Sequence, residues 1–153
     1  MPLGVTSCAK FIYDAFESDD KSKTFFHGHS YTANPLSCTA ALASLDLLEE
    51  KSTWENIERI HLKHKKFCEK IKDHNALNDV RVCGTILAFE IYTIEESHYL
   101  NKVSDKISEY FGKKNILMRP LGNVFYILPP YCISNEDLDL IYNEIGNFLN
   151  TLK

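Results

Sequence analysis

The chain is 153 residues long, is 44% apolar and carries a formal net charge of −4 at pH 7. This length and apolar content are enough for one buried core in a single domain. The acidic balance and the small number of arginines argue against a nucleic-acid-binding surface, which needs a clustered basic face.

Membrane insertion and secretion are not indicated by the sequence. No apolar run approaches the roughly 20 residues that a spanning helix needs. The first residues, MPLGVTSCAKF, lack the basic start and long apolar centre of a signal peptide. The five cysteines are scattered, and none forms a Cys-x-x-Cys pair. We therefore expect a cytoplasmic protein with reduced thiols and neither a disulfide framework nor a structural zinc site.

The first predicted elements are a short strand over Pro2–Cys8 and a helix over Ala9–Phe16, followed by a charged linker over Glu17–Lys23. A strand needs neighbours, and no other strand is evident until about Val80. The first part of the chain is therefore expected to belong to a sheet whose other strands are missing, which is typical of a fragment.

An aromatic and small-polar loop over Phe25–Thr32 leads into the helix with the clearest start signal. Asn34 suits the N-cap position and Pro35 the first helical position. Two adjacent apolar rows predict that this helix is largely buried and gives the loop before it a rigid base; the rows are Leu36, Ala40, Ala43 and Leu47, and Ala41, Leu45 and Leu48. Gly28 would let the backbone of this loop approach another molecule closely. The ordinary alternative is a core helix with an unremarkable connection.

The remaining elements alternate between helices and strands. The spacing predicts, in order, a helix from Ser52 or Thr53 to about His74, a turn over 75–79, strands over 80–82 and 85–92 with a bend at Gly84, a helix over 99–111 stopped by Gly112, strands over 115–118 and 124–128, and a helix from Ser134 to about Leu149 with a Ser-x-x-Asp capping signal. From Val80 onward this order predicts an α+β unit with its own core.

Two sequence blocks carry a resemblance to a known family. They are HGHSYTANPL at 27–36 and MRPLGNVFYILPPY at 118–131. They resemble the class III (fold type I) pyridoxal-phosphate aminotransferases, and the resemblance runs from Met1 to the end of the chain. Within this family the chain is most similar to the biotin-pathway branch, because Phe125 and Tyr126 stand where ornithine- or aminobutyrate-type members often carry aliphatic or charged residues.

The resemblance implies a fold and a domain organisation. The expected fold class is α/β to α+β, the C-terminal portion of a fold type I transferase. Residues 1–50 would be the incomplete end of the large cofactor-binding domain, 51–79 a connecting helix, and 80–153 the small C-terminal α+β domain.

The resemblance also implies a reaction. The biotin-pathway branch transfers an amino group from S-adenosylmethionine to 8-amino-7-oxononanoate, giving 7,8-diaminononanoate, and it acts as a homodimer with pyridoxal 5'-phosphate. In the family the Schiff-base lysine lies just upstream of the position that matches Met1. We therefore expect no catalytic residue within this chain, no activity of the chain alone and no tightly bound cofactor. The alternatives are a fragment of another class III aminotransferase, or a non-catalytic α+β interaction module.

The first candidate site residue is Ser30, with the backbone around Gly28 and His29. A hydroxyl and exposed N–H groups just before a helix can hold a phosphate, although an isolated serine more commonly caps a turn. In the family the matching residues, here His29 and Ser30, lie at the cofactor phosphate of the neighbouring subunit, across the dimer interface. The residue that matches Gly28 lies by the substrate.

The other candidates are Arg119 and Tyr126. An arginine fits a carboxylate with two parallel hydrogen bonds, but a lone surface arginine is usually only solvated. A tyrosine can pack an apolar substrate chain, or it can be a core aromatic of a strand. The resemblance implies that Arg119 binds the substrate carboxylate and that Tyr126 lines the substrate pocket. His61 and His64 have metal-ligand spacing, but no third ligand is apparent and we expect them to be solvated, so no metal site is predicted.

Overall fold

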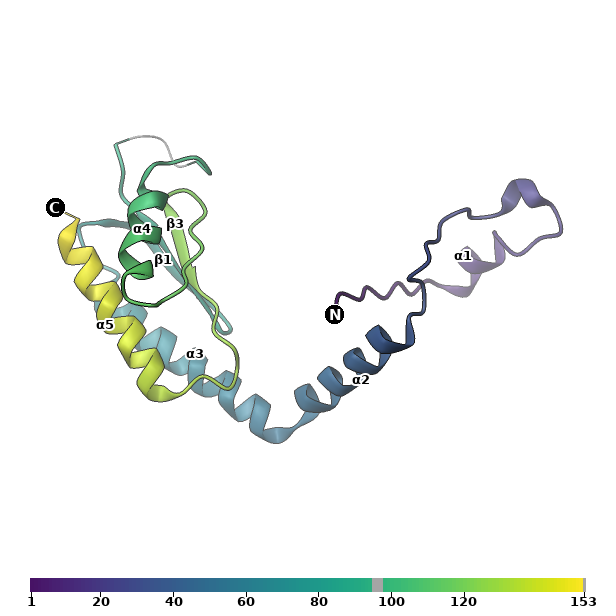
Figure 1. Cartoon of the computed structure of the whole chain (residues 1–153), viewed down its shortest axis with the longest axis horizontal. Coiled ribbons are helices and arrows are strands. Elements are labelled where there is room, and N and C mark those ends of the chain that lie inside the picture. Colours follow the sequence, from purple (N-terminus) through teal and green to yellow (C-terminus); the bar gives the residue numbers. More distant parts are fainter. Residues whose placement is uncertain (95–97, 153) are drawn as a thin grey trace. The chain divides into compact units, whose positions relative to one another are not determined.

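A computed structural model describes residues 1–94 and 98–152 (Figure 1). The chain divides into two compact units, Met1–Glu50 and Lys51–Lys153. The first unit contains α1 (Lys10–Asp14), a 3-10 helix η1 (Lys21–Lys23) and α2 (Pro35–Glu49). The second contains α3 (Lys51–Ile71), β1 (Leu77–Cys83), β2 (Ile86–Ile91), α4 (Val103–Gly112), β3 (Val124–Ile127) and α5 (Asn135–Thr151). In the described ranges, the structure has no helix that combines the length and the apolar character needed to cross a bilayer.

The start of α2 is confirmed in detail. The side-chain oxygen of Asn34 accepts hydrogen bonds from the N–H groups of Leu36 at 3.0 Å and Ser37 at 3.3 Å. Pro35 occupies the first turn, where it sacrifices no hydrogen bond. Local chemistry therefore fixes where this helix begins.

Two other expectations for the first unit are wrong. Helix α2 is not largely buried, since Leu36 is 68% exposed and Leu47 is 60% exposed. Residues 1–9 form no strand, and α1 is shorter than the helix expected over Ala9–Phe16. Burial and strand pairing both require partner elements, and the described part of Met1–Glu50 supplies neither a helix face nor a strand edge for them.

The second unit is built on a three-stranded antiparallel sheet in the order β1-β2-β3. The register pairs Leu87 with Ile127 and Phe89 with Phe125, and all four side chains are buried. Because side chains alternate along a strand, these residues form one apolar face of the sheet. The predicted bend at Gly84 is confirmed: it begins the two-residue turn between β1 and β2 with a φ of 56°. Strand β1 already begins at Leu77, so the turn expected over 75–79 is shorter than predicted.

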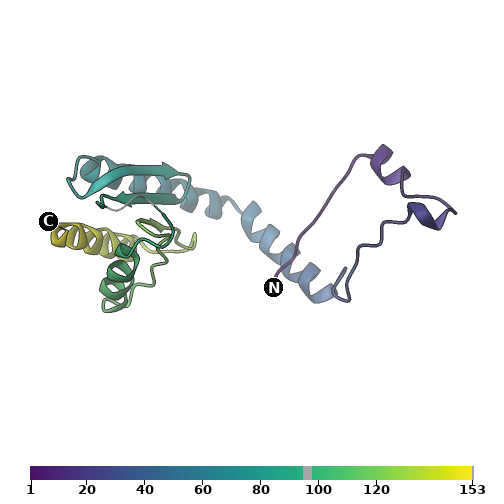
Figure 2. The same cartoon turned by 90° about the horizontal axis from the view of Figure 1, so that it is seen from above.

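Figure 2 shows α4 and α5 beside the strands, and a ring from each of the three helices of this unit reaches the apolar face of the sheet. Phe67 of α3 lies 6.4 Å from Phe89, measured between ring centroids. Phe111 of α4 and Phe148 of α5 lie 6.1 Å and 6.2 Å from Phe125. The core of the unit is therefore an aromatic cluster between the sheet and the helices, and the described side chains on the opposite face of the sheet are partly or fully exposed.

The segment between α4 and β3 differs from the expectation. Gly112 is the last residue of α4, and the left-handed backbone that follows the helix occurs at Asn115, with a φ of 58°. The N–H of Ile116 then donates to the carbonyl of Phe111 at 3.0 Å. Asparagine tolerates this conformation better than most residues, so the glycine is not needed as the stop. The strand expected over 115–118 is absent, since that segment is irregular in the structure.

The capping signal of α5 is confirmed. The hydroxyl of Ser134 accepts a hydrogen bond from the N–H of Asp137 at 3.0 Å and donates to its carboxylate at 2.7 Å. In the usual capping box the acidic side chain instead accepts from the backbone N–H of the cap residue. The signal still places the start of α5 correctly, at Asn135.

Candidate functional site

A tight turn over residues 29–33 precedes α2 and contains two of the expected phosphate ligands. The N–H of Thr32 donates to the carbonyl of His29 at 3.0 Å, and the N–H of Asn34 donates to the carbonyl of Tyr31 at 3.2 Å. Ala33 adopts the left-handed conformation with a φ of 55°. The turn thus holds Ser30 in an exposed position just before the helix.

Most hydrogen-bond donors of this turn are already used. The N–H of His29 donates to the hydroxyl of Thr32 at 3.3 Å, and the N–H of Tyr31 donates to the ring Nδ1 of His29 at 3.1 Å. The Asn34 cap takes the first amides of α2. Among the described residues, nothing accepts from the hydroxyl and N–H of Ser30 or from the N–H of Gly28. An anion at this turn would therefore be held by Ser30 and Gly28, while His29 shapes the turn.

Arg119 lies in the second unit, in the irregular segment that leads to β3. Its side chain is exposed, and no described residue forms a hydrogen bond or ion pair with its guanidinium group. It lines a surface groove whose other residues are Tyr99, Leu100, Lys102, Ser104, Asp105, Ser108, Met118 and Pro120. An unpaired guanidinium beside an open groove can take a carboxylate from solution.

Tyr126 lies in β3 and is half-buried. It pairs with Ala88, on the face of the sheet opposite to the buried Phe125. It lines a second groove with Met118, Leu128 and Pro129, among other residues. Met118 lines both grooves, so the structure brings Arg119 and Tyr126 to one neighbourhood of the second unit. Gly28, His29 and Ser30 belong to the first unit.

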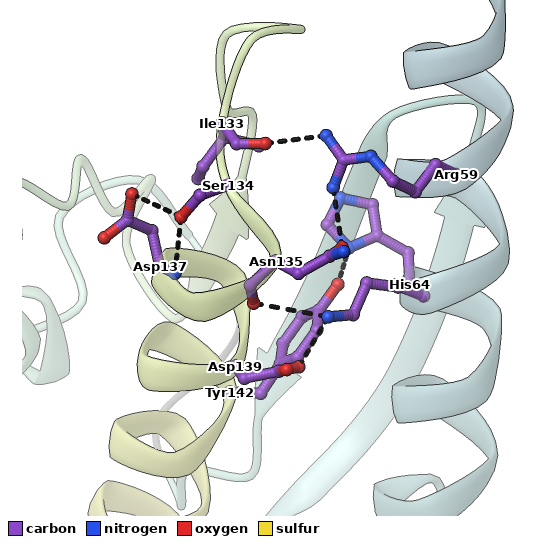
Figure 3. A network of polar contacts seen from close by, with 9 residues as sticks. Arg59, His64, Ile133, Ser134, Asn135, Asp137, Asp139 and Tyr142 are labelled. Carbon is purple, nitrogen blue, oxygen red and sulfur yellow. Dashed lines mark hydrogen bonds and ion pairs between the residues drawn. The ribbon is translucent and has the colours of Figure 1, made fainter.

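A second cluster of titratable side chains lies in the core of the second unit (Figure 3). His64 is completely buried, so the expectation that it is solvated is wrong. Its Nε2 lies 3.0 Å from the carbonyl oxygen of Thr85, which can only accept, so Nε2 carries the proton. Its Nδ1 then accepts from the hydroxyl of Tyr142 at 2.7 Å. The signal was present in the sequence, because His64 follows Ile60 by four residues on the apolar face of α3.

Polar contacts at the edge of this cluster tie α3 to the start of α5 (Figure 3). The guanidinium of Arg59 donates to the carbonyl of Ile133 at 2.6 Å and to the side-chain oxygen of Asn135 at 2.8 Å. The ammonium of Lys63 lies 2.8 Å from the carboxylate of Asp139. His61 also has a partner, since its Nδ1 lies 2.8 Å from the carbonyl oxygen of Gly84. Each of these side chains has a partner within the second unit, so we assign them a structural role.

The burial of His64 predicts a pH-dependent stability. Burial lowers the pKa of His64 below its ordinary value of 6.5. As the pH falls below 6.5, the unfolded chain takes up a proton that the folded chain does not. The free energy of unfolding should therefore be independent of this group above pH 6.5 and should decrease as the pH falls, until the folded-state pKa is reached. Urea unfolding at pH 7.5 and at pH 5.5 measures the difference, and His64→Leu should remove this part of it. An unchanged pH dependence in that variant would contradict the assignment.

Comparison with known proteins places these features in a family. The model of the aminotransferase class-III family matches residues 1–149. The chain belongs to the class III aminotransferases. It is 37% identical over 153 residues to the adenosylmethionine-8-amino-7-oxononanoate aminotransferase of Synechococcus elongatus. The alignment covers 99% of this chain and 35% of that relative. The enzyme of the same name from Geobacter sulfurreducens is 36% identical over 160 residues, with the same two coverages.

A solved structure of another class III relative has the same fold. The adenosylmethionine-8-amino-7-oxononanoate aminotransferase of Methanocaldococcus jannaschii superposes with a TM-score of 0.81 at 31% identity, covering 93% of this chain and 34% of that one. The chain thus spans about a third of the length of the curated relatives that it matches. The expected fold class, a C-terminal portion of a fold type I transferase, is confirmed.

Proposed function

We propose that this chain supplies the acceptor-binding part of an aminotransferase that moves an amino group from S-adenosylmethionine to 8-amino-7-oxononanoate, giving 7,8-diaminononanoate. The relatives that match nearly the whole chain are named for these two substrates. The observation that carries the proposal is the unpaired Arg119 beside grooves lined by Met118 and Tyr126. The proposed acceptor has the matching chemistry, a carboxylate at the end of an aliphatic chain.

Arg119 and Tyr126 have different roles in this proposal. The guanidinium of Arg119 binds the carboxylate with two parallel hydrogen bonds and so fixes one end of the acceptor. Tyr126 and Met118 pack against the aliphatic chain, and the tyrosine hydroxyl remains able to form a hydrogen bond. Holding the carboxylate and the chain of a flexible substrate removes much of the entropy that the reaction would otherwise cost.

Pyridoxal 5'-phosphate belongs to the same proposal. When bound, this cofactor supplies the electron sink for amino-group transfer. The hydroxyl and N–H of Ser30 and the N–H of Gly28 fit a phosphate, since no described residue accepts from them. By analogy with the family, Ser30 would hold the phosphate of the neighbouring subunit in a homodimer, with His29 shaping the turn around it. The N–H of Gly28 is added because no described residue accepts from it; in the family the matching residue lies by the substrate. The Schiff-base lysine would come from outside these 153 residues.

The origin of that lysine can be tested directly. Because no lysine of this chain lies in a matching sequence context, titration with pyridoxal phosphate followed by borohydride reduction should give no stoichiometric lysine adduct. Absorbance spectroscopy and mass spectrometry measure the result. One specific adduct at full stoichiometry would contradict the assignment and identify a cofactor lysine within the chain.

The role of Arg119 can be tested with the acceptor itself. Adding 8-amino-7-oxononanoate to the 15N-labelled chain should shift the backbone amide signals of Arg119 and Tyr126. In Arg119→Gln the affinity should fall about tenfold or more, since the ionic hydrogen bonds are lost. Arg81→Gln is a matched control, because Arg81 is exposed and paired with Asp79. Equal affinity in the wild type and in Arg119→Gln would rule out the proposed role.

A further inference from the structure

Gly122, three residues after Arg119, lies unusually close to another backbone segment. A Cβ atom at this position would collide with the carbonyl oxygen of His98 and would lie 3.1 Å from the carbonyl carbon of Tyr99. Gly122 also has a φ of 64°, which L side chains rarely adopt. Both its conformation and its surroundings therefore require glycine.

The segment that Gly122 contacts is itself held in place. The N–H of Asn101 donates to the carbonyl of His98 at 3.1 Å, and the N–H of Leu100 donates to the ring Nδ1 of His98 at 3.1 Å. Asn101 is 2% exposed, and its side-chain oxygen accepts from the N–H of Val103 in the first turn of α4 at 3.1 Å. Gly122 thus rests against a turn that is fixed to the start of α4.

Asn123, the next residue, anchors the chain at Gly122 to β2. It is 1% exposed. Its carbonyl accepts from the N–H of Ile91 at 2.8 Å, and its side-chain amide donates to the carbonyl of Ile91 at 3.1 Å. Leu121 and Val124 exchange two further backbone hydrogen bonds, at 2.7 Å and 3.2 Å. The chain is therefore anchored to the end of β2 immediately after Gly122.

From these contacts we propose that Gly122 and Asn123 are positioning residues for Arg119. This inference rests on the proposed function, in which Arg119 binds the carboxylate of the acceptor. No described residue holds the guanidinium of Arg119, so the backbone that carries it must be fixed instead. The close approach at Gly122 also brings Tyr99 and Leu100 to the groove that Arg119 lines. A binding group on a fixed backbone loses less entropy when it captures its ligand.

The first test measures how rigid the backbone around Arg119 is, and it needs no substrate. The 15N–1H heteronuclear NOE of the Arg119 and Leu121 amides should equal that of Phe125 in the sheet. In Gly122→Ala these two values should fall, and the Tyr99 and Leu100 amides should shift. Values as low in the wild type as those of the charged segment 17–23 would overturn the proposal, as would an unchanged Arg119 segment in a folded Gly122→Ala variant.

Gly84→Ala is the matched control for this variant. Gly84 has a φ of 56°, close to that of Gly122, but a Cβ at Gly84 would meet nothing within 4 Å. Both substitutions place alanine at a similar positive φ, and only the one at Gly122 adds the collision with His98. Gly84→Ala should leave the Arg119 amide and the affinity for the acceptor unchanged. An equal effect of both variants on Arg119 would overturn the proposal.

The second test asks whether fixing the backbone at Arg119 affects the affinity for the acceptor. In Gly122→Ala the affinity for 8-amino-7-oxononanoate, followed at the Tyr126 amide, should fall about tenfold although Arg119 is intact. If Gly122→Ala does not fold, Asn123→Ala is tested in the same way, because it removes the side-chain bond to Ile91 without adding a Cβ atom at Gly122. Affinity within about twofold of the wild type in a folded variant would overturn the positioning role.

The two proposals fail in different ways. If the wild type and Arg119→Gln respond equally to the acceptor, the proposed function fails, while the NOE values still decide whether Gly122 and Asn123 fix the backbone at Arg119. If Arg119→Gln loses affinity and Gly122→Ala does not, the proposed function stands and the positioning role is rejected.

Discussion

Phe125→Ala should lower the free energy of unfolding of the Lys51–Lys153 unit by about 4 kcal/mol, since it removes a large buried ring and leaves a cavity. Phe125 is completely buried. Its ring lies 4.6 Å from Phe89 and is also close to Phe111 and Phe148, so it joins β2, β3, α4 and α5. Urea denaturation followed by circular dichroism and by the tyrosine and tryptophan fluorescence of the unit measures the change.

Leu117→Ala is the control for this substitution in the same unit. Leu117 is 98% exposed, so truncating this large apolar side chain should change the free energy of unfolding by no more than about 0.5 kcal/mol. A loss below about 1 kcal/mol in Phe125→Ala would mean that the aromatic cluster is not the core of this unit.

His64→Leu should cost about 3 kcal/mol of stability at pH 7.5, although leucine has a similar volume and is more apolar. The substitution leaves the hydroxyl of Tyr142 without an acceptor and the carbonyl of Thr85 without a donor in the buried core. Burial also raises the pKa of the Tyr142 hydroxyl, so that group remains a protonated donor that must find a partner. Urea unfolding midpoints measure the loss.

The origin of this loss can be separated from packing by a second substitution. Adding Tyr142→Phe to His64→Leu should restore part of the stability, because it removes the unsatisfied hydroxyl. Lys66→Leu, at an exposed position of the same helix, should have little effect. If the double variant is less stable than His64→Leu alone, the unpaired hydroxyl is not the cause.

Several elements could be predicted from the sequence because their signals are local. The Asn34–Pro35 pair and the Ser134–Asp137 pair place the starts of α2 and α5, since each cap bonds to amides within three residues. Gly84 likewise places the turn between β1 and β2. These caps and this turn form between neighbouring residues, so they do not depend on how the rest of the chain packs.

The predictions of burial, which depend on contacts with other elements of the fold, are wrong for α2 and for His64. The apolar rows of α2 predict a surface that can be buried, but only neighbouring elements can bury it, and the described part of the first unit has none. The prediction that His64 is solvated is wrong for a related reason. A histidine can be buried when the fold supplies hydrogen-bond partners for both ring nitrogens. These partners, Thr85 and Tyr142, lie 21 and 78 residues away along the chain.

The sequence by itself determined the family resemblance, the starts of α2 and α5 and the candidate site residues Gly28, His29, Ser30, Arg119 and Tyr126, because these depend on residue identity and short-range spacing. Helix α4 instead begins at Val103, four residues after the predicted start. Only the tertiary structure decided that Tyr126 lies on the face of β3 opposite to the core, next to the groove of Arg119. It alone revealed the close approach of Gly122 to His98. The physical reason is that strand register and backbone contacts between distant segments are set by the packing of the whole unit, which no local pattern encodes.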